Sequence, residues 1–170
     1  MSLRKIINLT GKWLLLEVKQ MSKLSHLNEQ GEASMVDVGD KDVVSRVAVA
    51  SGFIRLKSMT IELVYDKEIK KGDVLTVAKI AGISAAKKTA ETIPLCHQIP
   101  ISHISIEFFR EDQGISIKAT VKTQAQTGVE MEALSAVSVS ALTLYDMCKA
   151  VDKEMRIEDI RLDVKEKSKP

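Results

Sequence analysis

Residues 101–126 read ISHISIEFFREDQGISIKATVKTQAQ. In both halves of this stretch apolar and polar residues alternate, which is typical of β-strands. In the first half, 101–110, Ile residues fall on both faces, so both faces can be partly buried, whereas 115–126 alternates cleanly. The polar connection EDQG between the halves is typical of a tight turn. The stretch therefore predicts an antiparallel hairpin of two strands.

The segments on either side of the hairpin extend this prediction to a whole fold. A further strand is expected before it, with Val47, Val49 and Phe53 facing inward, and an edge strand closes the chain. Helices are expected between these strands, which gives the order β, α-α, β-β, α, β over residues 45–56, 58–69, 74–92, 101–110, 115–126, 129–151 and 155–167. This order predicts an α+β fold with a ferredoxin-like antiparallel sheet and helices packed on one of its faces.

The predicted helices carry local signals for their ends. Ser58 is a suitable N-cap for the first, and Pro94 stops the second, which shows Val77, Ile80, Ala81 and Ser84 at helical spacing. The third helix is rich in Ala and Ser, which permits close approach to a sheet or to another helix. The lysine-rich end of the chain, KEKSKP, is expected to be mobile.

Residues 1–20 are expected to be an N-terminal extension, and residues 21–170 a single domain, because Met21 restarts the chain with MSKLSHLNEQG. A short added strand is the competing interpretation of the extension. Its longest apolar run, Trp13 to Leu16, is shorter than the apolar region of a signal peptide, and no other segment is long enough to span a bilayer.

The composition narrows the class of function. A net charge of +2 and 4% aromatic residues argue against a nucleic-acid or membrane-surface binder, because no basic face with stacking aromatics is present. Hydrophobic content of 45% with 28% charged residues is ordinary for a globular enzyme or binding domain. Two cysteines do not make a disulfide framework, which favours a reducing, cytoplasmic location.

Cys96 and His97 stand side by side between Pro94 and Pro100, and this pair has several interpretations. A zinc site could recruit them with His103 and Cys148, although structural zinc sites usually space two ligands a few residues apart. A Cys96 nucleophile would need a histidine base at hydrogen-bond distance, and sequence neighbours usually point apart. His97 as a simple turn-stabilising residue remains the third interpretation.

Lysines suggest a second candidate site. Asp146 and Lys149 are three residues apart in the third predicted helix, so their side chains are neighbours. The pair is either a surface ion pair or a proton-transfer carboxylate held beside a phosphate-binding cation. Lys71 and Lys87 stand near the two ends of the second helix and can supply further cations for a phosphorylated ligand.

Four blocks of the sequence resemble the signature blocks of the cyclic pyranopterin monophosphate synthase family, known as MoaC, in the same order. The resemblance extends from about Leu24 to Lys165, and four ordered blocks are a far more specific signal than one short motif. The blocks are MVDV (35–38), KGDVLTVAKIAGISAAKKTAETIPLCH (71–97), TGVEMEAL (127–134) and ALTLYDMCKAVDK (141–153).

The resemblance implies an activity in molybdenum cofactor biosynthesis. Family members convert (8S)-3′,8-cyclo-7,8-dihydroguanosine 5′-triphosphate to cyclic pyranopterin monophosphate and release diphosphate. They need no cofactor or metal for this and assemble as hexamers built from dimers, with active sites at subunit contacts. The resemblance assigns the catalytic roles to Asp146, Lys71 and Lys149. It assigns substrate binding to Leu95, Cys96, His97, Met131 and Glu132, with Arg46 as a further match. Lys87, for its charge, and Glu130 are added as candidate substrate-binding residues.

One departure from the family concerns the end of the chain. Family members usually end in a glycine-containing tail whose lysine helps to close over the phosphates, and here only Lys169 matches it. Two other functions stay open, a non-enzymatic ferredoxin-like binding or assembly module and a zinc-dependent hydrolase that uses Cys96 and His97.

Helix geometry adds an expectation about assembly. Glu132 and Asp146 are 14 residues apart, so they lie about 40° apart around a helix and roughly 21 Å apart along it. One compact site can use both only if a second copy of the helix runs antiparallel beside the first. The small residues between Ala133 and Ala141 would permit that packing, so we expect at least a dimer.

Overall fold

The computed structural model describes residues 4–7, 13–16 and 31–168. They belong to two units, one that ends at Val36 and one that begins at Asp37. In the first unit, two short strands, β1 (Arg4–Ile7) and β2 (Trp13–Leu16), pair antiparallel with each other. The expected boundary between an extension and a domain at residues 20 and 21 lies outside the described residues and stays a prediction.

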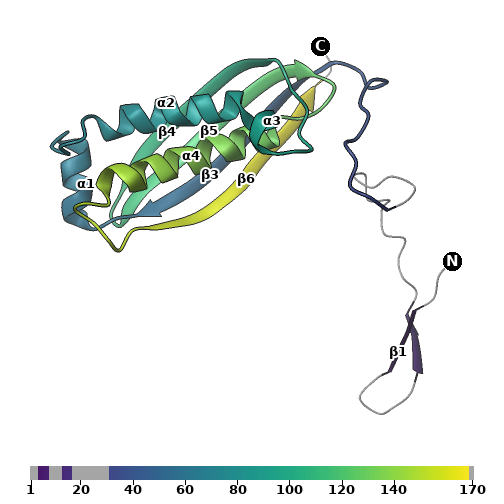
Figure 1. The fold of residues 1–170 in the computed structure, drawn as a ribbon, viewed down its shortest axis with the longest axis horizontal. Coiled ribbons are helices and arrows are strands. Elements are labelled where there is room, and N and C mark those ends of the chain that lie inside the picture. The colour runs from purple at the N-terminus through teal and green to yellow at the C-terminus, as the bar shows by residue number, and fades with distance from the viewer. Residues whose placement is uncertain (1–3, 8–12, 17–30, 169–170) are drawn as a thin grey trace. The chain divides into compact units, whose positions relative to one another are not determined.

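The second unit contains a four-stranded antiparallel sheet with the strand order β4-β5-β3-β6 (Figure 1). The predicted hairpin is present as β4 and β5, and the last strand lies at a sheet edge beside β3, as expected. The elements follow one another in the predicted order along the chain. The strands are β3 (Val44–Arg55), β4 (Ile101–Glu111), β5 (Gly114–Ala125) and β6 (Arg156–Ser168).

Two long helices lie side by side across one face of this sheet (Figure 1). The predicted α+β fold, an antiparallel sheet with helices on one face, is therefore confirmed. The helices are α1 (Ser58–Tyr65), α2 (Val74–Lys87), α3 (Thr89–Thr92) and α4 (Glu130–Cys148). In the described part of the chain, none of these helices has the length and apolar content needed to cross a membrane.

The face of β3 that meets the helices differs from the predicted one. Ala48, Ala50 and Ile54 are buried, whereas Val47, Val49 and Phe53 lie on the opposite face and are only half-buried. The reason is the close approach of α4. A Cβ atom on Gly52, which shares the inward face, would come within 2.7 Å of Val137 on α4. Small inward residues make room for the helix, so bulk alone does not identify the core face here.

The small residues of α4 pack within the chain. Ser140 donates a hydrogen bond to the carbonyl oxygen of Ala78 on α2, at 3.1 Å. Nearby, a Cβ on Gly82 would meet the carbonyl oxygen of Ala136 at 2.7 Å. The two helices thus run antiparallel in close contact. The buried residues of the stretch from Ala133 to Ala141 therefore contact the sheet and α2. The expected packing of this stretch against a second copy of the helix stays a prediction.

Two helix ends differ from the predicted ones. The first helix stops at Tyr65 because Lys67 adopts a φ of 60°, a left-handed conformation that ends a helix. The predicted second helix is divided at Lys88 into α2 and α3. There the Thr89 hydroxyl donates to the carbonyl oxygens of Ala85 and Ala86 and competes with the helical backbone pattern.

The end of the chain is ordered up to Ser168, which corrects the expectation of a mobile tail. In β6, Lys165 is paired with Ala48 and Lys167 with Arg46 of β3. Paired residues of antiparallel strands project to the same face, so both lysines project to the helix side of the sheet. Lys169 lies outside the described residues, so its expected role stays a prediction.

The start of α1 is held by Asp152 rather than by the predicted cap, Ser58. The Asp152 side chain is only 1% exposed. Its carboxylate accepts hydrogen bonds from the backbone N–H of Lys57 and the hydroxyl of Thr60, and from the backbone N–H of Glu154. Burial opposes ionisation, but these hydrogen bonds outweigh it and lower the pKa of Asp152. The carboxylate thus ties the loop after α4 to the first turn of α1.

We expect Asp152→Ala to lower the free energy of unfolding by about 2–4 kcal/mol, because it leaves three donors without their acceptor in a buried place. Because the pKa of Asp152 is lower in the folded state, the loss of stability in Asp152→Ala depends on pH. The stability that ionised Asp152 contributes is present above its unfolded-state pKa and is lost as pH falls through the lower folded-state value. Urea unfolding at pH 7 and below pH 4 measures both effects. Asp163→Ala, at an exposed ion pair, is the matched control and should have little effect at either pH.

Candidate active site

Asp146, near the end of α4, contacts two lysine ammonium groups from different parts of the chain. Lys149 Nζ lies 2.7 Å from one carboxylate oxygen. Lys71 Nζ, from the turn before α2, lies 3.0 Å from the other and also donates to the Asp146 backbone carbonyl at 2.9 Å. The contact with Lys149 follows from the three-residue separation within α4, whereas the contact with Lys71 depends on the fold. The three predicted catalytic residues therefore form one cluster.

The electrostatics of this cluster favour an ionised carboxylate. The hydrogen bonds from Lys149 and then Lys71 lower the pKa of Asp146, and the carboxylate in turn raises the pKa of Lys149. All three side chains are about half exposed, so the cluster is open to a ligand from solvent. An ionised carboxylate between two cations can accept a proton, while the cations attract phosphate oxygens.

A second group of predicted residues lies at the opposite end of α4. The loop after α3 makes a tight turn there, with Pro94 inside it and Cys96 N–H donating to the Ile93 carbonyl. This turn presents three half-buried residues, Leu95, Cys96 and His97. α3, which leads into this loop, contacts α4. Burial, and then the charge of Glu132 in the first turn of α4, raise the pKa of Cys96.

Glu132 differs from Asp146 in both its burial and the direction of its pKa shift. Its side chain is only 4% exposed, and burial, with a smaller contribution from the charge of Glu130, raises its pKa. A carboxyl group of this kind retains its proton more readily than one in water and can act as an acid. Neighbouring Met131 is exposed instead. One helix thus carries two carboxyl groups, at opposite ends, whose environments shift their pKa values in opposite directions, which is the usual arrangement of acid and base pairs in enzymes.

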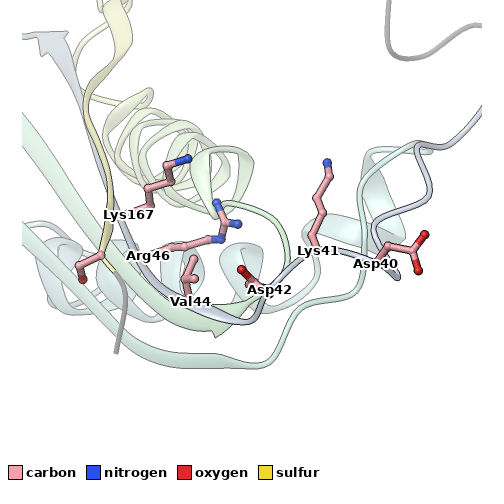
Figure 2. Close-up of a pocket in the computed structure, with 7 residues that line it drawn as sticks. Asp40, Lys41, Asp42, Val44, Arg46 and Lys167 are labelled. Atoms are coloured by element: carbon pink, nitrogen blue, oxygen red, sulfur yellow. The ribbon is translucent and has the colours of Figure 1, made fainter.

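Arg46, near the start of β3, borders an open pocket of about 440 Å³ (Figure 2). The pocket lies at the end of the sheet where β5 leads into α4. Its guanidinium group donates to the backbone carbonyl oxygens of Ala125 and Gln126, at 2.9 and 2.8 Å, which fixes its position. Figure 2 shows Arg46 and Lys167 extending side by side, in agreement with their pairing between β3 and β6. The other residues of the lining are Asp40, Lys41, Asp42, Val44 and Ser168.

Lys87 does not join the other predicted lysines. It lies at the end of α2, 16 residues after Lys71, which corresponds to roughly 24 Å along a helix. There it borders a different groove of about 520 Å³, whose lining combines isoleucines with Ser102 and His103. Within one chain the structure therefore separates Lys87 from Lys71 and Lys149, which the sequence had grouped with it as phosphate contacts.

A sequence model of the MoaC family matches residues 35–168, which is most of the chain. The chain belongs to the MoaC family. The described second unit, from Asp37, contains nearly all of the matched region. The residues that the sequence resemblance selected therefore lie within the part of the chain that the family covers.

Curated members of the MoaC family are similar to this chain over most of their length. A protein of Dinoroseobacter shibae is 55% identical over 151 residues, which cover 88% of this chain and 96% of that protein. One of Chloroflexus aurantiacus is 56% identical over 143 residues, covering 83% and 88%. One of Thermoanaerobacter sp. is 57% identical over 141 residues, covering 82% and 89%. Each is named cyclic pyranopterin monophosphate synthase.

The structure adds one residue to the site that the MoaC resemblance had not selected. Lys165 of β6 forms an ion pair with Glu130, in the first turn of α4. With Arg46 and Lys167 it places three cations on the helix side of the sheet near that turn. A sequence signal existed, since Lys165 and Lys167 alternate along the last strand, but only the register with β3 shows which face they share.

The residues of the alternative zinc site are not brought together. Cys148 is fully buried in the core, where burial and the charge of Asp152 raise its pKa to about 11. Cys96 lies at the other end of α4, beside Glu132. Within residues 31–168, no three His, Cys, Asp or Glu side chains are grouped as metal ligands would be.

Proposed function

We propose that this chain is a cyclic pyranopterin monophosphate synthase that acts in molybdenum cofactor biosynthesis. The substrate would be (8S)-3′,8-cyclo-7,8-dihydroguanosine 5′-triphosphate, and diphosphate would be released. The observation that carries the proposal is the contact of Asp146 with both Lys71 and Lys149. The sequence resemblance assigns catalysis to these three residues, and relatives about 55% identical bear the name of this activity.

The chemistry needs cations for a triphosphate that carries about four negative charges. Lys71 and Lys149 at one end of α4, and Arg46 at the other, are suited to this role. When the cyclic phosphate forms, a substrate hydroxyl attacks the α-phosphorus, and the bond from that phosphorus to the bridging oxygen of the diphosphate breaks. The charge that develops on the departing diphosphate is stabilised by ammonium and guanidinium groups held near it.

Proton transfers are divided between the two carboxyl groups. Asp146, with its lowered pKa, is ionised and accepts protons, while Glu132, with its raised pKa, is the better donor. Opening the imidazole ring and building the pyrazine ring require several such transfers. Leu95, Cys96, His97 and Met131 would hold the base and sugar, with Glu130 close by. Cys96 acts here as a binding residue, since burial and the charge of Glu132 oppose formation of its thiolate.

The separation of the two groups of residues supports a homo-oligomer. Glu132 and Asp146 are roughly 21 Å apart along α4, too far for one reacting ring to touch both. We therefore propose that each site combines the Asp146 end of one chain with the Glu132 end of another, in a dimer-based hexamer. We call these two ends of α4, with the site residues around them, the half-sites. The partners would be other copies of this chain and the small-molecule substrate, without nucleic acid. A cytoplasmic location completes the proposal and agrees with two unpaired cysteines.

The test is to supply the purified chain with the cyclised dihydro-GTP substrate and to measure pterin product and diphosphate. Equal amounts of the two products are expected. The same assay separates the open alternatives, because a binding or assembly module would return the substrate unchanged. A zinc-dependent hydrolase would lose its activity to a chelator, whereas the proposed synthase chemistry rests on the carboxylates and lysines named above.

A further inference from the structure

Gly128 lies in the connection between β5 and α4, within the block TGVEMEAL (127–134), and the proposed reaction gives it no role. A glycine is required by the backbone where φ is positive. Among the described glycines, Gly31 and Gly72 have such a φ, whereas the φ of Gly128 lies outside the left-handed region. Other residues adopt that kind of backbone readily, so the glycine at this position serves another purpose.

The space beside Gly128 is filled by a charged group. A Cβ atom on Gly128 would overlap one carboxylate oxygen of Glu130 and would lie 2.8 Å from the other oxygen and 2.6 Å from Cδ. These three atoms would be its nearest neighbours. At Gly82 and Gly114, in contrast, the nearest atoms include backbone atoms of a packed helix or strand. Those two glycines permit close packing, whereas Gly128 makes room for one side chain of the candidate site.

The backbone around Gly128 is held on both sides, so a shift of the chain would not relieve the overlap with an added Cβ. Before it, the carbonyl oxygens of residues 125–126 accept hydrogen bonds from the guanidinium group of Arg46. After it, the side chain of Val129 is only 1% exposed and belongs to the core. The carboxylate of Glu130 stands at the end of a flexible side chain, and it is therefore the group that has to move.

The carboxylate of Glu130 holds the ammonium group of Lys165 in an ion pair between α4 and β6. The Lys165 side chain is 64% exposed, so without this partner its ammonium group would take many positions. An ion pair this exposed contributes little to stability. It does fix the ammonium group on the side of the sheet to which Arg46 and Lys167 also project. An ammonium group has three donors, so it can bind a carboxylate and a phosphate oxygen together.

We infer that Gly128 is a positioning residue of the Glu132 half-site. Because Gly128 has no Cβ, the Glu130 side chain can tilt toward the start of α4, as side chains of a helix do, and hold Lys165 where a phosphate oxygen of the substrate binds. The inference rests on the proposed function, which brings a triphosphate to this half-site. Gly128 itself does not touch the substrate, and its effect passes through Glu130 to Lys165.

Gly128→Ala is expected to raise the KM of the substrate at least about 10-fold, the effect of losing one hydrogen bond to a charged group, and to lower kcat by a smaller factor. The dissociation constant of inorganic triphosphate, measured by calorimetry, should rise with KM. The urea midpoint should stay the same or rise slightly, because alanine restricts the unfolded chain more than glycine does. The matched control is Gly39→Ala, whose Cβ would lie 3.2 Å from an Asp37 carboxylate oxygen. It should keep the wild-type KM.

Two double variants test the route through the ion pair. Glu130→Ala and Lys165→Met each remove the pair, so adding Gly128→Ala to either should raise KM and the triphosphate dissociation constant no further. Multiplying effects in both double variants would overturn the inference, and so would wild-type KM and triphosphate affinity of Gly128→Ala, or a clear loss of its stability. If the wild-type chain binds triphosphate but forms no pterin product, the proposed function fails, and calorimetry of the same variants still decides the role of Gly128.

Discussion

Asp146→Asn is expected to lower the turnover of cyclised dihydro-GTP by about 100- to 10,000-fold, the range that removal of a general acid or base usually produces. The amide keeps the shape of the side chain but cannot accept a proton, and it removes the negative charge that holds Lys71 and Lys149 in place. The fold should not change, because the Asp146 side chain is exposed. Single-turnover kinetics with saturating substrate measures the effect.

The matched control is Asp163→Asn. Asp163 also forms an exposed ion pair, with Arg161 at 3.0 Å, but it lies on β6 outside both half-sites. It should turn over substrate at the wild-type rate. If Asp146→Asn kept a quarter or more of the wild-type rate, Asp146 would not be the catalytic base. If it lost cooperative unfolding together with activity, the cluster would be structural.

Mixing two inactive variants is expected to restore activity. In Glu132→Gln one half-site is defective, and in Asp146→Asn the other is, so a site built from the intact half of each chain works. After random subunit exchange about one site in four receives both intact halves, and about a quarter of the wild-type activity should return. The glutamine keeps the volume of the buried Glu132 side chain, which protects the packing around it. Activity and exchange of differently tagged chains are measured on the same mixture.

A second mixture provides the control for complementation. Asp146→Asn and Lys149→Met affect the same half-site, so no combination of these chains contains both residues intact at one end of α4. No recovery is expected from this pair. If the first mixture also failed to recover activity although exchange was complete, each chain would build its whole site by itself, and the shared-site arrangement would be wrong.

The sequence predicted the fold well where periodicity and turn residues decide the structure. The hairpin of β4 and β5 and the order of elements follow from alternation, helical spacing and the turn EDQG. The inward face of β3 was predicted wrongly, because the choice of Ala48 over Val47 depends on how closely α4 approaches the sheet. That approach is a tertiary property, set by pairs such as Gly52 and Val137.

Spacing along the chain predicted only some of the contacts in the candidate site. The Asp146–Lys149 contact follows from a three-residue separation in a helix. The contact with Lys71 joins segments 75 residues apart, and Lys165 reaches Glu130 only through the pairing of β6 with β3. The family resemblance supplied the role of Lys71, whereas charge alone grouped Lys87 with it. The length of α2 separates those two lysines, which residue type alone does not reveal.

The measurement that tests the central claim most directly is the reaction of the purified wild-type chain with (8S)-3′,8-cyclo-7,8-dihydroguanosine 5′-triphosphate. Cyclic pyranopterin monophosphate and diphosphate should appear at the same rate and in equal amounts, and the Asp146→Asn chain should form neither at a comparable rate. Unchanged substrate after incubation with the wild-type chain, under conditions in which a curated MoaC relative consumes it, would contradict the account.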